Sequence, residues 1–85
     1  MTKEELMIIA GMVHDIGESE KHHITMDYSS SLGFVTLYVH KKDGKGYSDG
    51  IEDSIDIMSL DAEAKAFLSR WTETLRKERV QNASH

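Results

Sequence analysis

The chain has 85 residues, carries a net charge of −5, and contains 39 % hydrophobic and 29 % charged residues. This predicts one globular domain without a membrane span, because no apolar run approaches the ~18 residues that a span needs. The absence of cysteine excludes disulfides, thiolate metal sites and cysteine nucleophiles. The negative charge argues against direct nucleic-acid binding by phosphate neutralisation. Because residues 1–5 lack the basic region of a signal peptide, we expect a cytoplasmic protein.

A helix is predicted over residues 2–16. Thr2 and Glu5 have the spacing of a capping box, and Gly17 is well placed to end the helix. Apolar residues at helical spacing form its inner face: Leu6, Ile9, Ala10, Val13 and Ile16. A second apolar set projects away from that face: Met7, Ile8 and Met12. This is more apolar surface than the helix of a small monomer needs, so either the strands cover a wide stripe or another molecule does. On the second alternative, Met7, Ile8 and Met12 form an oligomer or partner interface.

Strands are predicted next. Residues 22–29 alternate in polarity, and one side of this strand is apolar: Ile24, Met26 and Tyr28. Residues 34–40 are β-branched and aromatic with apolar side chains on both faces, so this strand should lie centrally in its sheet. Asp43-Gly44 indicates a hairpin turn. A third strand returns from Tyr47, and residues 54–58 are either its continuation after a bulge or a separate segment.

The longest periodic run of the chain, residues 60–75, predicts a second helix. Apolar side chains line one of its faces: Leu60, Ala64, Phe67, Leu68, Trp71 and Leu75. Ser59 or Asp61 can cap its start, and a group of bases near its end suits the helix dipole. The order of elements predicts a small α+β domain over residues 1–80, an antiparallel meander of two or three strands packed against two helices. Residues 81–85 are predicted to be a frayed tail.

A histidine and an aspartate stand side by side at the end of the first predicted helix. His14-Asp15-Ile16-Gly17 resembles the histidine-aspartate tetrapeptide of HD-type metal phosphohydrolases, and this resemblance implies two metal ligands and a metal-dependent phosphohydrolase activity. It covers only the tetrapeptide and the apolar run before it. No histidine precedes His14, and strand-like sequence follows where that family has helices. We therefore interpret the pair as the polar side of a helix's last turn, where a histidine suits the dipole.

Three more histidines form a second candidate for metal binding. His22, His23 and His40 lie in predicted strands, and strand pairing can bring two imidazoles together. His22 and His23 cannot share a site without a bulge, because adjacent strand residues point to opposite faces. Residues 29–31 lack the pattern around a serine nucleophile. Residues 44–46 lack the form of a phosphate loop, and residues 49–53 depart from the pattern of a calcium loop. We therefore expect no catalytic activity, no cofactor and no metal.

Charge is segregated along the second half of the chain. Residues 43–63 hold seven acids and one base, whereas residues 64–79 hold five bases and two acids. An acidic patch of that density repels itself unless a cationic partner occupies it. A subset of its acids is predicted to bind a protein partner with a basic surface: Asp49, Glu52, Asp53 and Asp56. The alternative is an acidic solvated segment that precedes a helix N-terminus.

The leading hypothesis is a small acidic, non-catalytic interaction protein that binds and inhibits or modulates a partner macromolecule. In size, acidity and lack of cysteine the chain is similar to accessory factors of phages and mobile elements, which include inhibitors of host defence. The alternative is a homo-oligomeric small-ligand-binding protein, with Met7, Ile8 and Met12 at a two-fold interface of a homodimer. Metal-dependent phosphohydrolysis through His14 and Asp15 ranks third.

Overall fold

The computed structural model describes the backbone of residues 1–42 and 48–83, and the predicted turn at 43–44 lies outside this part. The elements in chain order are α1 (Lys3–Ile16), β1 (His22–Ser29), β2 (Phe34–Lys42), β3 (Ser48–Ile57) and α2 (Ala62–Ala83). The strands form an antiparallel sheet in the order β1-β2-β3. This arrangement confirms the predicted α+β domain and its α-β-β-β-α order.

Helix α1 begins and ends where the local sequence predicts. The Glu5 N–H donates to Thr2 Oγ1 at 3.1 Å and the Thr2 N–H donates to Glu5 Oε1 at 3.1 Å, which completes the capping box. Gly17 ends the helix with φ of 67° and ψ of −139°, a positive-φ conformation that costs glycine little. The second carboxylate oxygen of Glu5 accepts a 2.7 Å hydrogen bond from the Leu60 N–H. The cap therefore also ties the start of α1 to the segment that leads into α2.

Strand β2 is central, as its apolar character on both faces predicted. Its pairing with β1 runs without a register shift, whereas its pairing with β3 shifts twice, between Val39 and His40 and between Lys41 and Lys42. The third strand is thus one irregular strand over residues 48–57, which settles the alternative left open by the sequence in favour of continuation past a bulge. The irregular end of the sheet lies beside the acidic residues of β3.

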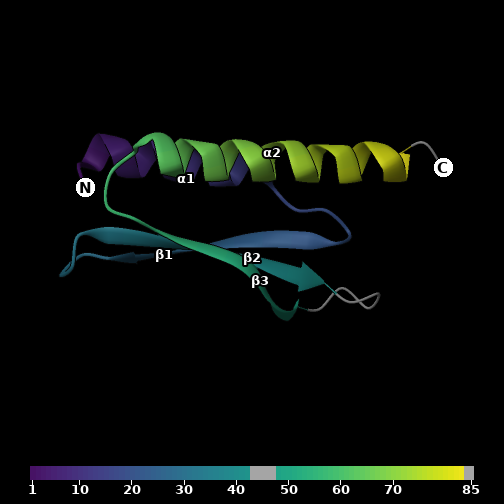
Figure 1. The fold of residues 1–85 in the computed structure, drawn as a ribbon, viewed down its shortest axis with the longest axis horizontal. Helices are drawn as coiled ribbons and strands as arrows, with labels where there is room; N and C mark the ends of the chain where they lie inside the picture. The colour runs from purple at the N-terminus through teal and green to yellow at the C-terminus, as the bar shows by residue number, and fades with distance from the viewer. Residues whose placement is uncertain (43–47, 84–85) are drawn as a thin grey trace.

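Both helices lie on the same face of the sheet (Figure 1). Helix α1 contacts α2 and β1, and α2 contacts β3. Fully or nearly buried apolar side chains fill the layer between helices and sheet: Ile9, Ile16, Val35, Leu37, Val39, Ile57, Ala64, Phe67, Leu68, Trp71 and Leu75. Neither helix covers the opposite face of the sheet, so the domain has two layers and one core.

Three apolar positions differ from the simplest reading of the sequence. Met12 is only partly exposed and packs against the core, so it belongs to the inner side of α1. Met26 and Tyr28 point to the helix-covered face, in register with Leu37 and Val35, yet they are 37 % and 40 % exposed. The reason is that β1 lies at the edge of the sheet.

Helix α2 continues to Ala83, past the position where the sequence predicted a frayed tail from residue 81. Residues 84–85 lie outside the described part. The extension moves the bases of residues 76–79 away from the last turn of the helix, so they do not serve its own dipole as predicted.

Truncation of a core side chain should expose how much this small domain depends on its single core. Leu68 is fully buried, so Leu68→Ala should lower the free energy of unfolding by about 2 to 5 kcal/mol. Leu32→Ala is the matched control, because Leu32 is 71 % exposed and its truncation should change stability by no more than about 0.5 kcal/mol. Urea denaturation followed by circular dichroism measures both, and equal effects would contradict this core.

Candidate functional site

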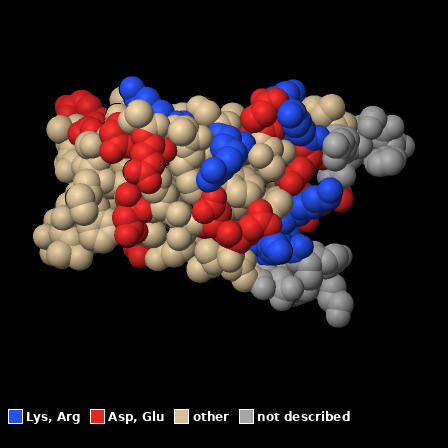
Figure 2. All heavy atoms as spheres, viewed as in Figure 1, with Lys and Arg blue, Asp and Glu red and all other residues tan. Residues whose placement is uncertain are grey.

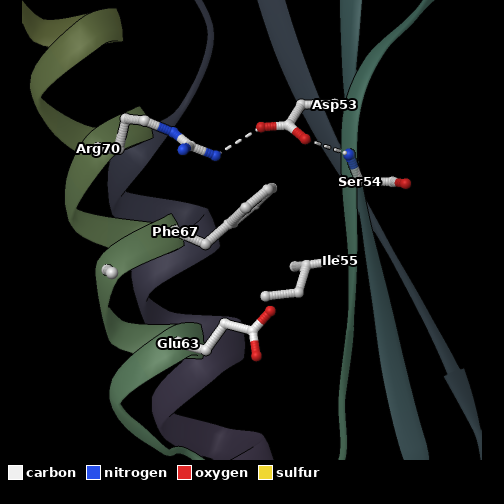
Figure 3. A pocket seen from close by; sticks show the side chains of 7 residues that line it. Asp53, Ser54, Ile55, Glu63, Phe67 and Arg70 are labelled. Atoms are coloured by element: carbon white, nitrogen blue, oxygen red, sulfur yellow. Dashed lines mark hydrogen bonds and ion pairs between the residues drawn. The ribbon is translucent and has the colours of Figure 1, made fainter.

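The acidic strand and the basic helix lie side by side, and their charges pair within the molecule. Asp53 on β3 is the centre of this contact. Its Oδ2 accepts a hydrogen bond from Arg70 Nη2 at 2.6 Å, and its Oδ1 accepts one from the Ser54 N–H at 2.9 Å (Figure 3). Its Oδ2 also accepts a hydrogen bond from Trp71 Nε1 at 3.1 Å. Asp53 therefore fastens β3 to α2, and a partner would have to compete with Arg70 to bind this carboxylate.

Glu52, the next acid of the predicted binding set, is also engaged. Its Oε2 lies 3.1 Å from Nε2 of the buried His22, and its Oε1 lies 3.8 Å from Lys41 Nζ. The carboxylate of Glu78 on α2 takes the other side of the ring, with Oε2 2.9 Å from His22 Nδ1. One imidazole thus joins the first strand, the third strand and the second helix.

The surroundings of His22 favour its charged form. Burial by itself lowers the pKa of His22, but the hydrogen bonds to Glu78 and Glu52 outweigh burial and raise the pKa above its usual value. Burial likewise opposes the charge of Glu78, while hydrogen bonds from Ser19 Oγ and His22 hold the pKa of that carboxyl below its usual range. The indole of Trp71 packs against the ring at 5.2 Å between centroids. His22, Glu52 and Glu78 thus form an ion triad that links β1, β3 and α2.

The triad does not have the geometry of a metal site. Glu52 and Glu78 approach opposite nitrogens of the His22 ring, so the two carboxylates and one ring nitrogen do not converge on a common point. Among the residues that the structure describes, no group of three histidine, cysteine, aspartate or glutamate side chains is placed to hold a metal ion.

A depression of about 270 Å³ lies between the free edge of β3 and helix α2, next to the Asp53 contact. Its lining is mixed: Asp53, Ser54, Ile55, Glu63, Ala66, Phe67 and Arg70. Ile55 and Phe67 point toward one another across the floor, and the carboxylate of Glu63 lies at the end remote from Arg70 (Figure 3). The depression combines an apolar floor, one exposed carboxylate and an edge strand.

The remaining acids are spread around this region. Asp56 points to the uncovered face of the sheet, where its Oδ1 accepts a 2.8 Å hydrogen bond from Thr36 Oγ1. Asp61 caps α2 by accepting a 2.9 Å hydrogen bond from the Ala64 N–H. The side chain of Asp49 lies outside the described part. Figure 2 shows red acidic and blue basic side chains interleaved on this face of the molecule, so the charges segregated in sequence are mixed in space.

The other sequence candidates are placed apart from this region. His14 and Asp15 are 90 % and 85 % exposed at the end of α1, with 3.4 Å between His14 Nδ1 and Asp15 Oδ1. His23 and His40 stack on the uncovered face of the sheet with their centroids 4.6 Å apart, and His22 points to the helix-covered face instead. The three strand histidines therefore do not form one site.

The predicted apolar interface on α1 is reduced to two residues. Met7 and Ile8 are 63 % and 49 % exposed, whereas Met12 packs against the core. Whether Met7 and Ile8 contact another molecule remains a prediction.

Comparison with known proteins gives no relative. No protein family, no curated protein and no solved structure matches the chain. No helix in the described part is long and apolar enough to cross a membrane.

The sequence did not predict that side chains of α2 hold the segment between α1 and β1 in place. Besides the bonds of Glu78 to Ser19 and His22, Arg79 donates a hydrogen bond to the carbonyl oxygen of Ile16 and so caps the end of α1. These contacts span more than 50 positions of sequence, and no local spacing signals them. The only hint was the surplus of charged residues at the end of a predicted helix.

Replacing the buried imidazole should destabilise the protein in a pH-dependent way. His22→Gln leaves Glu52 and Glu78 without a shared cation, so the free energy of unfolding should fall by about 2 kcal/mol at about pH 5.5, which lies above the lowered pKa of Glu78 and below the raised pKa of His22. Because the folded pKa of His22 is raised, its stabilising contribution is fully present below the unfolded value of about 6.5 and is lost as pH rises through the folded pKa. The deficit of the variant should therefore shrink toward high pH.

Urea denaturation across a pH series measures this deficit. His14→Gln is the matched control, since His14 is 90 % exposed and its replacement should leave the pH profile as in the wild type. A His22→Gln deficit that is constant with pH would show that His22 acts through packing alone.

Proposed function

We propose that this protein is a small non-catalytic interaction protein, which binds a basic segment of a partner protein along the free edge of β3. The observation that carries the proposal is the depression between the edge strand β3 and α2, which has an apolar floor and one exposed carboxylate, that of Glu63. Occupation of that site would mask a basic surface of the partner and so inhibit or modulate it.

Some main-chain groups of β3 are available to an extended segment at its free edge. The Ser54 N–H donates to the Asp53 side chain and therefore faces away from β2. Since backbone direction alternates along a strand, the N–H and C=O of Asp56 and the C=O of Ser54 also face the open edge. An extended segment at this edge would form main-chain hydrogen bonds there and place alternate side chains over the depression.

The acidic groups select a cationic segment. Glu63 is exposed on the helix side of β3, and Asp56 is exposed on the uncovered face of the sheet. Lysine or arginine side chains of the partner can therefore reach a carboxylate from either side, while Ile55 and Phe67 receive an apolar side chain between them. We assign the binding to Asp56 and Glu63 rather than to Glu52 and Asp53, because the latter pair already holds cations of this chain.

The depression favours a peptide over a small molecule. Its volume of about 270 Å³ lies below the range of about 300 to 1,000 Å³ that is typical of small-molecule pockets. The depression is also open to solvent rather than enclosed, as suits an occupant that continues beyond it.

Charge reversal tests the proposal without disturbing the internal ion pairs. A displayed library of random linear peptides serves as the probe. Selection on the wild-type protein should enrich peptides in which lysine or arginine alternates with apolar residues, and their binding should weaken as salt rises. The double variant Asp56→Lys, Glu63→Lys should weaken binding of the selected peptides at least about tenfold, which corresponds to the loss of about 1.4 kcal/mol.

The matched control is Asp15→Lys, Glu20→Lys, which makes the same change in net charge at exposed acids outside this region. It should retain the affinity of the wild type. Selected peptides without basic residues, or equal loss of binding in both double variants, would overturn the assignment to β3.

A further inference from the structure

The opposite edge of the sheet, at β1, exposes unpaired main-chain groups. The Lys42 N–H donates to the carbonyl oxygen of Lys21 at 2.9 Å, which fixes the direction of the backbone along the regular β1-β2 pairing. The main-chain groups of residues 23, 25, 27 and 29 accordingly face β2, and those of residues 22, 24, 26 and 28 face the edge. At residue 22 the edge is closed, because both main-chain groups of His22 bond to Ser19. Within the described ranges 1–42 and 48–83, no main-chain group bonds to Ile24, Met26 or Tyr28 at this edge, so these residues can accept a further strand.

Strand β1 lacks the features with which edge strands usually avoid pairing. Such strands carry charges, proline or bulges. Strand β3 has acids and two register shifts, and one of its outward N–H groups is occupied by Asp53. Strand β1 has no proline, no register shift and one acid, Asp27, which points to the uncovered face. The two edges of one sheet are therefore built differently.

We propose that β1 pairs antiparallel with β1 of a second copy of this chain, with Met26 facing Met26 across a two-fold axis. In this register each open residue meets an open residue: Ile24 lies opposite Tyr28 of the second copy, and Tyr28 lies opposite its Ile24. A shift by two positions in one direction would place Tyr28 against the closed His22, and a shift in the other would place Ile24 beyond the strand. The register with Met26 at its centre uses all the open groups, giving about six main-chain hydrogen bonds.

The side chains of β1 are complementary to themselves in the same register. Ile24, Met26 and Tyr28 point to the helix-covered face, and pairing would cover the 37 % and 40 % exposed surfaces of Met26 and Tyr28 with their counterparts. On the other face, Asp27 would lie opposite Thr25, so no like charges meet. The same operation on β3 would bring its acids together. Self-pairing is thus favourable at β1 and unfavourable at β3.

The helix layer is compatible with this arrangement. Helix α1 is the helix that contacts β1, and it carries the exposed side chains Met7 and Ile8. The second copy would bring its own α1 alongside, above a continuous sheet made from both copies. The exposed apolar surface of Met26 and Tyr28 is then removed from water at the boundary between the two copies.

Opposite charges at the centre of the proposed pairing provide the test. Sedimentation velocity at high micromolar concentration should show a dimer for the wild type. Met26→Lys and Met26→Glu should each be monomeric, because each places two like charges face to face across the axis. An equimolar mixture of the two variants should sediment as a dimer, since lysine then faces glutamate.

Leu32→Lys is the matched control. It replaces another exposed apolar residue by lysine, in the β1-β2 turn, and should remain dimeric. A monomeric wild type, a dimeric Met26→Lys variant, or folded Met26→Lys and Met26→Glu variants whose mixture stays monomeric would overturn the proposal. Circular dichroism establishes that the variants are folded. The result is independent of peptide binding at β3, because the two strands form opposite edges of the sheet.

Discussion

The packing of both helices on one face of a three-stranded sheet is the constraint from which the other features of this protein follow. A chain of this length can bury one core, and it does so by closing α1 and α2 over Val35, Leu37 and Val39 of the central strand. Strand β2 therefore pairs with a strand on each edge, and the helices cover one of its faces. The outer strands each keep a free edge, and the opposite face of the sheet stays open to solvent.

Ion pairs within this protein hold the helix layer against the sheet. The acids of β3 lie beside the bases of α2, and Asp53 binds Arg70 while Glu52 and Glu78 hold His22 between them. Buried and half-buried ion pairs of this kind contribute orientation as well as energy, because their hydrogen bonds accept only one placement of helix against strand. Some of the acids that the sequence predicted to bind another molecule therefore pair with cationic groups of the same chain.

The two proposed contacts use different properties of the two free edges. The proposed peptide contact at β3 relies on charge, since carboxylates on either side of the strand would repel a second acidic strand and attract a basic one. The proposed self-contact at β1 relies on shape and register, since this strand offers an uninterrupted main chain with apolar side chains on its helix-covered face. The two contacts would not compete, because the sheet holds the two edges apart.

The local sequence determined the elements and their caps. Thr2, Glu5 and Gly17 mark the ends of α1 because capping bonds span only a few residues, and the alternation of residues 22–29 determined which side of β1 faces the core. Tertiary structure alone decided the rest. Glu78 and His22 meet across 56 positions, and Met26 is exposed while Met12 is covered, because pairing and exposure depend on neighbours brought in from distant segments.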